Sequence, residues 1–253
     1  MTRMTRWKAA AIHLLISFTV VGTITGLIYW LWFPYGMIRI AGMDRLLITM
    51  LCVDIVAGPL LTLIVFKAHD MRLTRRDLAT IGVMQALFMG YALHTAWVSR
   101  PVFMVWAVDK MYLLYANELE PEDLAKGRTA DTRSLAWFGP RRYAVKLPRD
   151  ADARAAIFAD LIRRQRPLEQ LPEHYGPYAD KRAEVLKKAM PAVAASLPDW
   201  MQASTLDDAL ARSGRSRAGL RLVPIHSARA ASMMLVDAVT AEPVTTLTPP
   251  PVP

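Results

Sequence analysis

The chain has 253 residues, of which 53% are hydrophobic and 21% are charged, and its formal net charge is +9. This hydrophobic share excludes an intrinsically disordered protein and exceeds that of an ordinary soluble domain. The single cysteine, Cys52, excludes an internal disulfide and a zinc site built on paired cysteines. Basic residues are spread along the chain without a long block of one sign, so we expect no nucleic-acid partner.

Three apolar segments, 9–33, 46–66 and 78–99, are long enough to cross a bilayer, for which about 20 residues suffice. Their only charged residue is Asp54. A cleaved signal peptide is the alternative for the first segment, but its apolar region would span only about 7 to 15 residues. A buried soluble core is the alternative for all three. We predict a membrane domain over 1–99 whose three transmembrane helices contact the lipid bilayer.

The Lys and Arg residues that flank these segments predict their orientation. Those before the first segment are Arg3, Arg6 and Lys8, and those between the second and third are Lys67, Arg72, Arg75 and Arg76. The remaining loop holds only Arg39 and Arg45. Because short cytoplasmic loops carry the excess of Lys and Arg, we expect a bacterial inner-membrane protein with a cytoplasmic N-terminus and a periplasmic C-terminal domain.

Residues 100–247 predict a small α+β domain, followed by a Pro-rich tail at 248–253. Strands are expected at 102–108, 111–115, 143–147 and 220–225, and on both sides of a turn at 237–242. A polar loop is expected at 118–134. The expected helices are one that Asp150 or Asp152 caps, one over 177–197 that Pro191 kinks or ends, and one that Ser204 or Thr205 caps and that ends near Gly214.

Motifs of common catalytic sites are absent from the sequence. Residues 214–218 come closest to the GxSxG motif of serine hydrolases but lack its final glycine. His226 with Ser227, or His174 with Asp180, could form part of a triad, yet any chain of this size supplies such combinations by chance. We therefore predict no catalytic, cofactor-binding or metal-binding residues and no enzymatic activity; an envelope enzyme is the third-ranked alternative.

Asp54 is the most costly residue of the membrane domain. A carboxylate at the centre of a spanning helix costs about 2.5–3.5 kcal/mol on insertion scales, whereas each Leu, Ile, Val or Phe returns at most about 0.6 kcal/mol. Such a residue is expected to face protein. One interpretation is an internal hydrogen bond to Thr23, Thr25 or Gln85; the other is contact with a partner's helix or a proton path.

Two further features of the apolar segments are candidates for helix packing. Gly58 and Pro59 follow Asp54 by one turn, and we expect a kink there because proline lacks a backbone donor and clashes with the preceding turn. Gly22 and Gly26 have the spacing that lets two helices approach closely, either within the chain or with another protein. Our candidate partner-helix contact or intramembrane polar site is therefore Asp54, Gly58, Pro59, Gly22 and Gly26.

Several strings resemble the TfpX/TfpZ family of type IV pilin accessory proteins. They are RWKA at 6–9 with IHLLIS at 12–17, VDIVAGPLLTLIVFK at 53–67, and RPV at 100–102 leading to VDK at 108–110. The resemblance is sharpest over 6–119. In a similar turn at 235–242 the family leads us to expect glycine where this chain has Ala241.

The resemblance implies a non-enzymatic, chaperone-like accessory factor of the inner membrane that assists type IV pilin stability and pilus assembly. The implied partner is the major pilin subunit, and the pilus assembly platform is a further candidate. The alternative function is a membrane-anchored sensor or regulator whose periplasmic domain binds a ligand. Its weakness is that only short basic flanks are expected in the cytoplasm.

Overall fold

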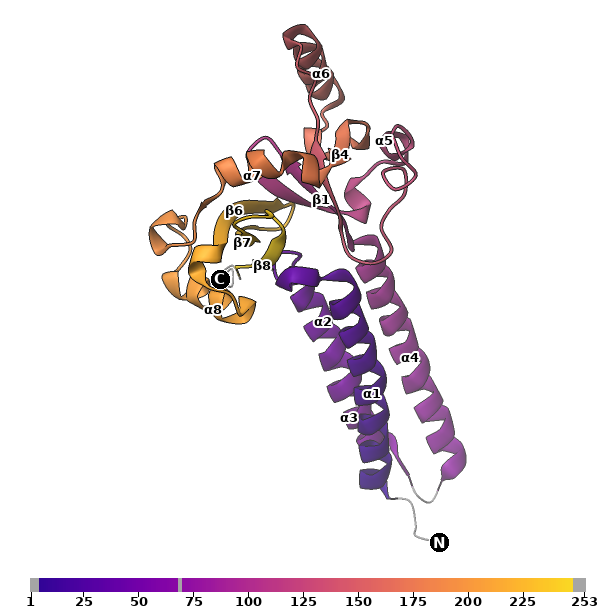
Figure 1. Ribbon diagram of the computed structural model, residues 1–253. Coiled ribbons are helices and arrows are strands. Elements are labelled where there is room, and N and C mark those ends of the chain that lie inside the picture. Colours follow the sequence, from indigo (N-terminus) through magenta and orange to yellow (C-terminus); the bar gives the residue numbers. More distant parts are fainter. Residues whose placement is uncertain (1–4, 68–69, 248–253) are drawn as a thin grey trace. The chain divides into compact units, whose positions relative to one another are not determined.

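A computed structural model describes residues 5–67 and 70–247, and the chain within it forms two compact units (Figure 1). The membrane unit contains the apolar helices up to Trp30 and from Met43 to Val98. The sheet unit contains Leu31–Gly42 together with the chain from Ser99 onward. The predicted tail at 248–253 and the basic residue Arg3 lie outside the described residues.

Three helical rods form the membrane unit (Figure 1). They are α1 (Arg6–Trp32), a middle rod made of α2 (Met43–Leu51), the π-helical η2 (Cys52–Ala57) and α3 (Gly58–Val65), and α4 (Met71–Val98). Each rod is long and apolar enough to span a membrane, as predicted. The helices begin before the predicted apolar segments because charged side chains at a helix end can reach the interface while the backbone stays helical.

The middle rod is distorted where Gly58 and Pro59 were expected to kink it. The N–H of Gly58 donates to the carbonyl of Val53, five residues back, so the turn before the proline is π-helical. The π-helical partner of the Asp54 carbonyl would be the N–H of Pro59, which proline lacks. The distortion therefore leaves the Asp54 carbonyl without a backbone partner.

The sheet unit contains one mixed sheet of eight strands in the order β4-β3-β1-β2-β6-β7-β8, with β5 paired to β6. The strands are β1 (Pro101–Ala107), β2 (Lys110–Tyr115), β3 (Arg141–Val145), β4 (Tyr175–Pro177), β5 (Met190–Pro191), β6 (Leu220–Ser227), β7 (Ala231–Asp237) and β8 (Pro243–Thr246). The β1–β3 and β2–β6 pairs are parallel and the other pairs are antiparallel. The predicted strands and the mixed helix-and-sheet class are confirmed.

The sheet unit also contains helices, of which α5, α6, α7 and α8 are labelled in Figure 1, and short 3-10 turns. The helices are α5 (Pro121–Ala125), α6 (Ala151–Arg164), α7 (Arg182–Lys188) and α8 (Ala203–Ser213). The 3-10 turns are η1 (Pro34–Gly36), η3 (Ala116–Glu118), η4 (Leu168–Gln170), η5 (Pro172–His174), η6 (Tyr178–Lys181), η7 (Ala194–Ser196) and η8 (Arg217–Gly219). The predicted loop at 118–134 thus contains a short helix, α5, which starts at a proline whose fixed φ suits the first helical position.

Two of the predicted helices have the expected ends. The Asp150 carboxylate caps α6 by accepting the Ala153 N–H at 2.7 Å. Helix α8 ends at Gly214, whose φ of +62° suits glycine. The predicted cap of α8 at Ser204 or Thr205 is wrong, because the helix already begins at Ala203 and contains both residues.

The predicted helix over 177–197 is wrong in its length, whereas its expected end at Pro191 is confirmed. The continuous helical part covers η6 and α7, Ala189 is already extended, and the 3-10 turn η7 follows separately. Proline biases the preceding residue toward extended backbone. Met190 and Pro191 accordingly form β5, which pairs with β6.

Residues 31–42, between the first two rods, pack into the sheet unit. Phe33, Met37 and Ile40 are buried. The Ile40 carbonyl accepts hydrogen bonds from the Ser227 hydroxyl at 2.9 Å and the Tyr115 hydroxyl at 3.3 Å. In the 3-10 turn η1, the Tyr35 carbonyl accepts hydrogen bonds from the hydroxyls of Thr245 and Thr246 on β8. This loop and the C-terminal sheet therefore lie in one folded body.

Two hairpin turns place non-glycine residues at positive φ. In the β7–β8 turn, Ala241 has a φ of +58°, so the position where the resemblance led us to expect glycine is one that glycine suits. In the β1–β2 turn, Val108 also has a φ of +58°, and the Asp109 N–H donates to the Ala107 carbonyl. A β-branched residue at positive φ is strained.

We expect Val108→Gly to stabilise the protein. The side chain is 57% exposed, so the change loses little burial and relieves about 1 kcal/mol of backbone strain. Thermal unfolding of the full chain in detergent should shift upward by about 2–4 °C. The control is Val239→Gly, in another turn, where φ is not positive and the side chain is 77% exposed. An equal or larger gain in the control would contradict this explanation.

Candidate functional site

A polar cluster joins the three rods of the membrane unit. His13 of α1 lies with Nδ1 2.6 Å from the Thr62 hydroxyl of α3 and with Nε2 2.9 Å from Oε1 of Gln85 on α4. Gln85 donates from Nε2 to the Asp54 carbonyl at 3.2 Å. We call His13, Asp54, Thr62 and Gln85 the polar cluster. His13 and Thr62 were not among the predicted site residues. Their partners lie on other helices, and the sequence does not indicate these partners until the helices are packed.

The distortion at Pro59 explains the position of Gln85. The Asp54 carbonyl has lost its backbone donor, and an unsatisfied carbonyl is expensive in a membrane. The Gln85 amide supplies the missing donor, and its oxygen is then directed to His13. The proline thus leaves the Asp54 carbonyl free, and the Gln85 side chain that binds this carbonyl also contacts His13, so that all three rods are joined.

The Asp54 carboxyl group has one oxygen without a hydrogen-bond partner in the described chain. Asp54 is 3% exposed, and its Oδ2 atom has no hydrogen-bond partner among the residues the structure describes. The bond from Thr25 that we considered is not formed, since the Thr25 hydroxyl is also unpartnered within the described chain. Of the internal partners considered, Gln85 is the one that the structure brings to Asp54.

The Gln85 amide occupies the space beside Gly58, so any larger residue at position 58 would displace this amide. A Cβ atom on Gly58 would lie 2.2 Å from Nε2 of Gln85. By contrast, a Cβ atom on Gly22 or Gly26 would meet no atom within 4 Å. Gly22 is nine residues from His13, so at 3.6 residues per turn it lies on the opposite face of α1. The structure therefore groups Asp54, Gly58 and Pro59 and leaves Gly22 and Gly26 elsewhere.

A groove lies between α1 and α4. It consists of two adjoining cavities of about 390 and 420 Å³, which His13, Ile16 and Gly82 line together. The larger one extends toward Thr62 and Phe66, and the smaller one is lined by Asp54, Gln85 and Ala86 among others. We call these two cavities the α1–α4 groove. Apart from the polar cluster, its lining is almost entirely apolar or small.

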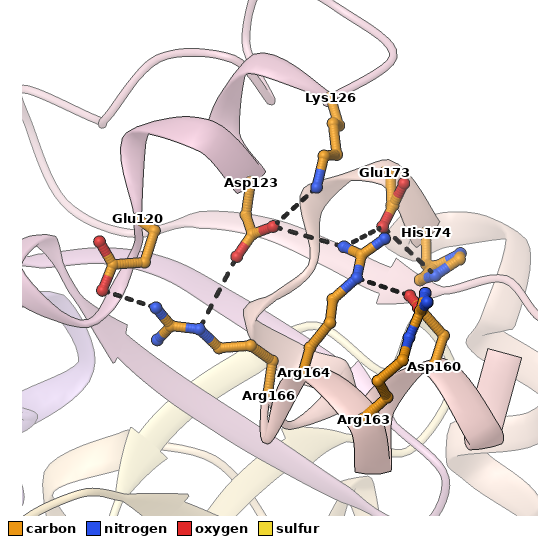
Figure 2. Close-up of polar contacts among 9 residues, drawn as sticks. All are labelled: Glu120, Asp123, Lys126, Asp160, Arg163, Arg164, Arg166, Glu173 and His174. Carbon is orange, nitrogen blue, oxygen red and sulfur yellow. Dashed lines mark hydrogen bonds and ion pairs between the residues drawn. The ribbon is translucent and has the colours of Figure 1, made fainter.

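In the sheet unit, charged side chains form an ion-pair network on α5, α6 and η5 (Figure 2). Its contacts are Asp123 to Lys126, Arg164 and Arg166, Glu120 to Arg166, Arg164 to Asp160 and Glu173, Arg163 to Asp160, and Glu173 to His174. Asp123 is buried at its centre. The pairs that do not involve Asp123 are more exposed, and such pairs contribute about 0–1 kcal/mol each.

The residue pairs considered for catalysis do not form catalytic arrangements. Asp180 pairs with Lys146, whereas His174 lies 3.9 Å from Glu173. Ser227 donates its hydroxyl to the Ile40 carbonyl and not to His226. No group of three His, Cys, Asp or Glu residues within 5–67 and 70–247 is placed to hold a metal ion.

Burial lowers the pKa of His174 below its ordinary value, with a partly opposing contribution from Glu173. The unfolded chain, with a histidine pKa of about 6.5, therefore binds more protons than the folded chain. We expect His174 to cost stability as the pH falls through 6.5 toward the lower folded pKa. Unfolding temperatures at pH 7.5 and 5.0 should differ less in His174→Gln than in the wild type. Equal pH dependence in both proteins would contradict this expectation.

A shallow cavity of about 460 Å³ lies beside β3 and β4 of the sheet unit. Tyr175 and Tyr178 line it, but both use their hydroxyls internally, on the carbonyls of Glu169 and Ala241. The lining residues Arg142 and Glu242 form an ion pair with each other, and the lining residue Asp131 lies 3.9 Å from Arg141. The cavity thus offers few free polar groups to a ligand, which gives no specific support to the sensor alternative.

The fold and these sites define a class: a protein with three helices able to span a membrane, followed by a mixed α/β sheet domain. Comparison with known proteins shows what this chain is similar to. The family model for fimbrial assembly protein FimB matches residues 2–42, which include α1 and the segment that packs into the sheet unit. The TfpX/TfpZ resemblance is compatible with this match.

Three curated relatives are also described as fimbrial assembly proteins. The fimbrial assembly proteins of serogroups I and E1 of Dichelobacter nodosus are each 27% identical over 148 residues, which is 58% of this chain and 57% of theirs. The protein of serogroups C1 and C2 is 28% identical over 118 residues, or 46% of this chain and 90% of its own. The chain thus spans little more than half the length of the first two. No solved structure matches it significantly.

Proposed function

We propose that this chain is a non-enzymatic accessory factor of the bacterial inner membrane that assists type IV pilin stability and pilus assembly. The observation that carries the proposal is the similarity to fimbrial assembly proteins in a chain with three helices able to span a membrane. The polar cluster supports it, because polar groups of this kind within a membrane serve helix contacts or transport pathways.

In this proposal the N-terminus lies in the cytoplasm and the sheet unit in the periplasm. The distribution of Lys and Arg in the flanks favours this orientation. The packing of 31–42 into the sheet unit supports the number of crossings, in either orientation, since three crossings place that loop and the chain after Ser99 on the same side.

The proposed partner is the major pilin, with the pilus assembly platform as a further candidate. A pilin that waits in the inner membrane has an apolar helix in the bilayer and a head outside it. A factor with spanning helices and a sheet unit can contact both parts. Among the predicted site residues, Asp54, Gly58 and Pro59 would contact the pilin helix through the polar cluster, and Gly22 with Gly26 would offer a second, separate helix face.

Deletion of the gene in its own host tests the proposal. We expect fewer surface pili and less pilin protein at unchanged pilin mRNA, with recovery when the full chain is supplied in trans. Photocrosslinkers on the sheet unit should capture pilin. Normal piliation in the deletion strain would contradict the proposal. A change in pilin mRNA with unchanged pilin lifetime would favour the regulator.

A further inference from the structure

Resting on the proposed function, we infer that the α1–α4 groove binds the transmembrane helix of the pilin and that a hydrogen-bond donor on this helix pairs with the Asp54 carboxyl group. The groove lies on the face of α1 that carries His13, whereas Gly22 and Gly26 lie on the opposite face.

One oxygen of the Asp54 carboxyl group, Oδ2, is free to accept a hydrogen bond from an incoming helix. Asp54 is 97% buried, its Oδ2 atom has no partner among the described residues, and the side chain lines the groove. A buried polar group without a hydrogen bond is costly, and more so in a membrane. Position 54 is midway along the Met43–Val65 span, so no lipid headgroup lies at that depth. A donor carried by another helix would satisfy the group.

The second argument is the shape of the groove. Gly82 and Ala86, one turn apart on α4, line one wall, and a Cβ atom on Gly82 would meet nothing within 4 Å. Small residues let the backbone of a second helix approach closely. On α1, Ile16 and Val20 line the same groove and are 56% and 48% exposed, so they offer apolar surface to an incoming helix. A lipid acyl chain would also fit the apolar walls but carries no donor for Asp54.

Photocrosslinking tests this inference in the full chain in its native membrane, with the major pilin as the probe. A photoreactive residue replaces Met89, which lines the groove, or Leu87, which points away from it and is 69% exposed. We expect pilin adducts through the transmembrane segment from position 89 at a yield about tenfold above that from position 87. Adducts of lipid only, or equal yields from both positions, would overturn the inference.

Substitutions then test the two arguments separately. Asp54→Leu removes the acceptor, and we expect about a tenfold loss of the adduct from position 89, which corresponds to about 1.4 kcal/mol. Gly82→Leu fills the groove, because only open space lies within 4 Å of a Cβ at this position, and should cause a similar loss. Gly90→Leu on α4, which does not line the groove and has no atom within 4 Å of its added Cβ, should leave the yield unchanged. Membrane levels of each variant are measured, so that loss of protein is not read as loss of binding.

The outcomes separate this inference from the proposed function. If pilin is captured from the sheet unit or from position 87 but not from the groove, the groove inference is wrong and the accessory function stands. If pilin is captured from no position, both are wrong. If Asp54→Leu and Gly82→Leu, at normal membrane levels, retain full adduct yield at position 89, the contact does not depend on the carboxyl group or the small-residue wall, and the inference is overturned.

Discussion

Replacing Gly58 with alanine is expected to dismantle the polar cluster. The new Cβ atom would lie 2.2 Å from Nε2 of Gln85, so the amide has to leave both the Asp54 carbonyl and His13. Each hydrogen bond between transmembrane helices is worth about 0.6 kcal/mol and up to about 1.7 kcal/mol. We therefore expect a loss of about 2 kcal/mol, measured by thermal unfolding in detergent, together with reduced piliation.

A matched control and a double variant make this prediction specific. Gly90→Ala on α4 has no atom near its new Cβ and should be neutral or slightly stabilising, as alanine usually is in a helix. Once Gln85→Ala has removed the obstructing amide, Gly58→Ala should cost little more. Additive losses in the double variant would show that Gly58 acts independently of Gln85 and would contradict our explanation.

The largest loss of stability is expected from Phe103→Ala in the sheet unit. Phe103 lies on β1, is fully buried, and packs edge-to-face on Tyr143 and Tyr175 at ring-centroid distances of 5.5 and 5.6 Å. Removing a buried phenylalanine costs about 3–5 kcal/mol. Thermal unfolding should therefore move down by about 10 °C.

The control for Phe103 is an exposed phenylalanine of the same unit. Phe138 is 70% exposed, and Phe138→Ala should change the unfolding temperature by no more than about 1–2 °C. A similar shift in both variants would mean that β1 and its aromatic neighbours do not form the core of the sheet unit.

Local patterns were sufficient to predict the spans and most strands. Apolar segments long enough to cross a bilayer are recognisable from length alone, and the β1–β2 hairpin follows from a short polar pair between two β-rich runs. Helix prediction failed at 177–197, where the apolar spacing was helical but Pro191 and pairing with β6 favoured a strand. The failure shows tertiary pairing prevailing over local periodicity.

Features that depend on distant contacts could not be predicted. The carbonyl of Ile40 binds Ser227, 187 residues further along the chain, and no local signal indicates that a short loop joins the sheet unit. Asp54 was identified because a charge within an apolar run is costly. Its neighbours His13 and Thr62 became visible only after helix packing brought three rods together.

A topology measurement tests the central claim most directly. Alkaline phosphatase, which is active only in the periplasm, and green fluorescent protein, which fluoresces in the cytoplasm but not after export by the general secretory pathway, are fused in parallel behind Leu247 and in the loop between the second and third rods. We predict phosphatase activity without fluorescence behind Leu247 and fluorescence without phosphatase activity in the loop. Fluorescence behind Leu247, or phosphatase activity in the loop, would contradict three crossings with a periplasmic sheet unit.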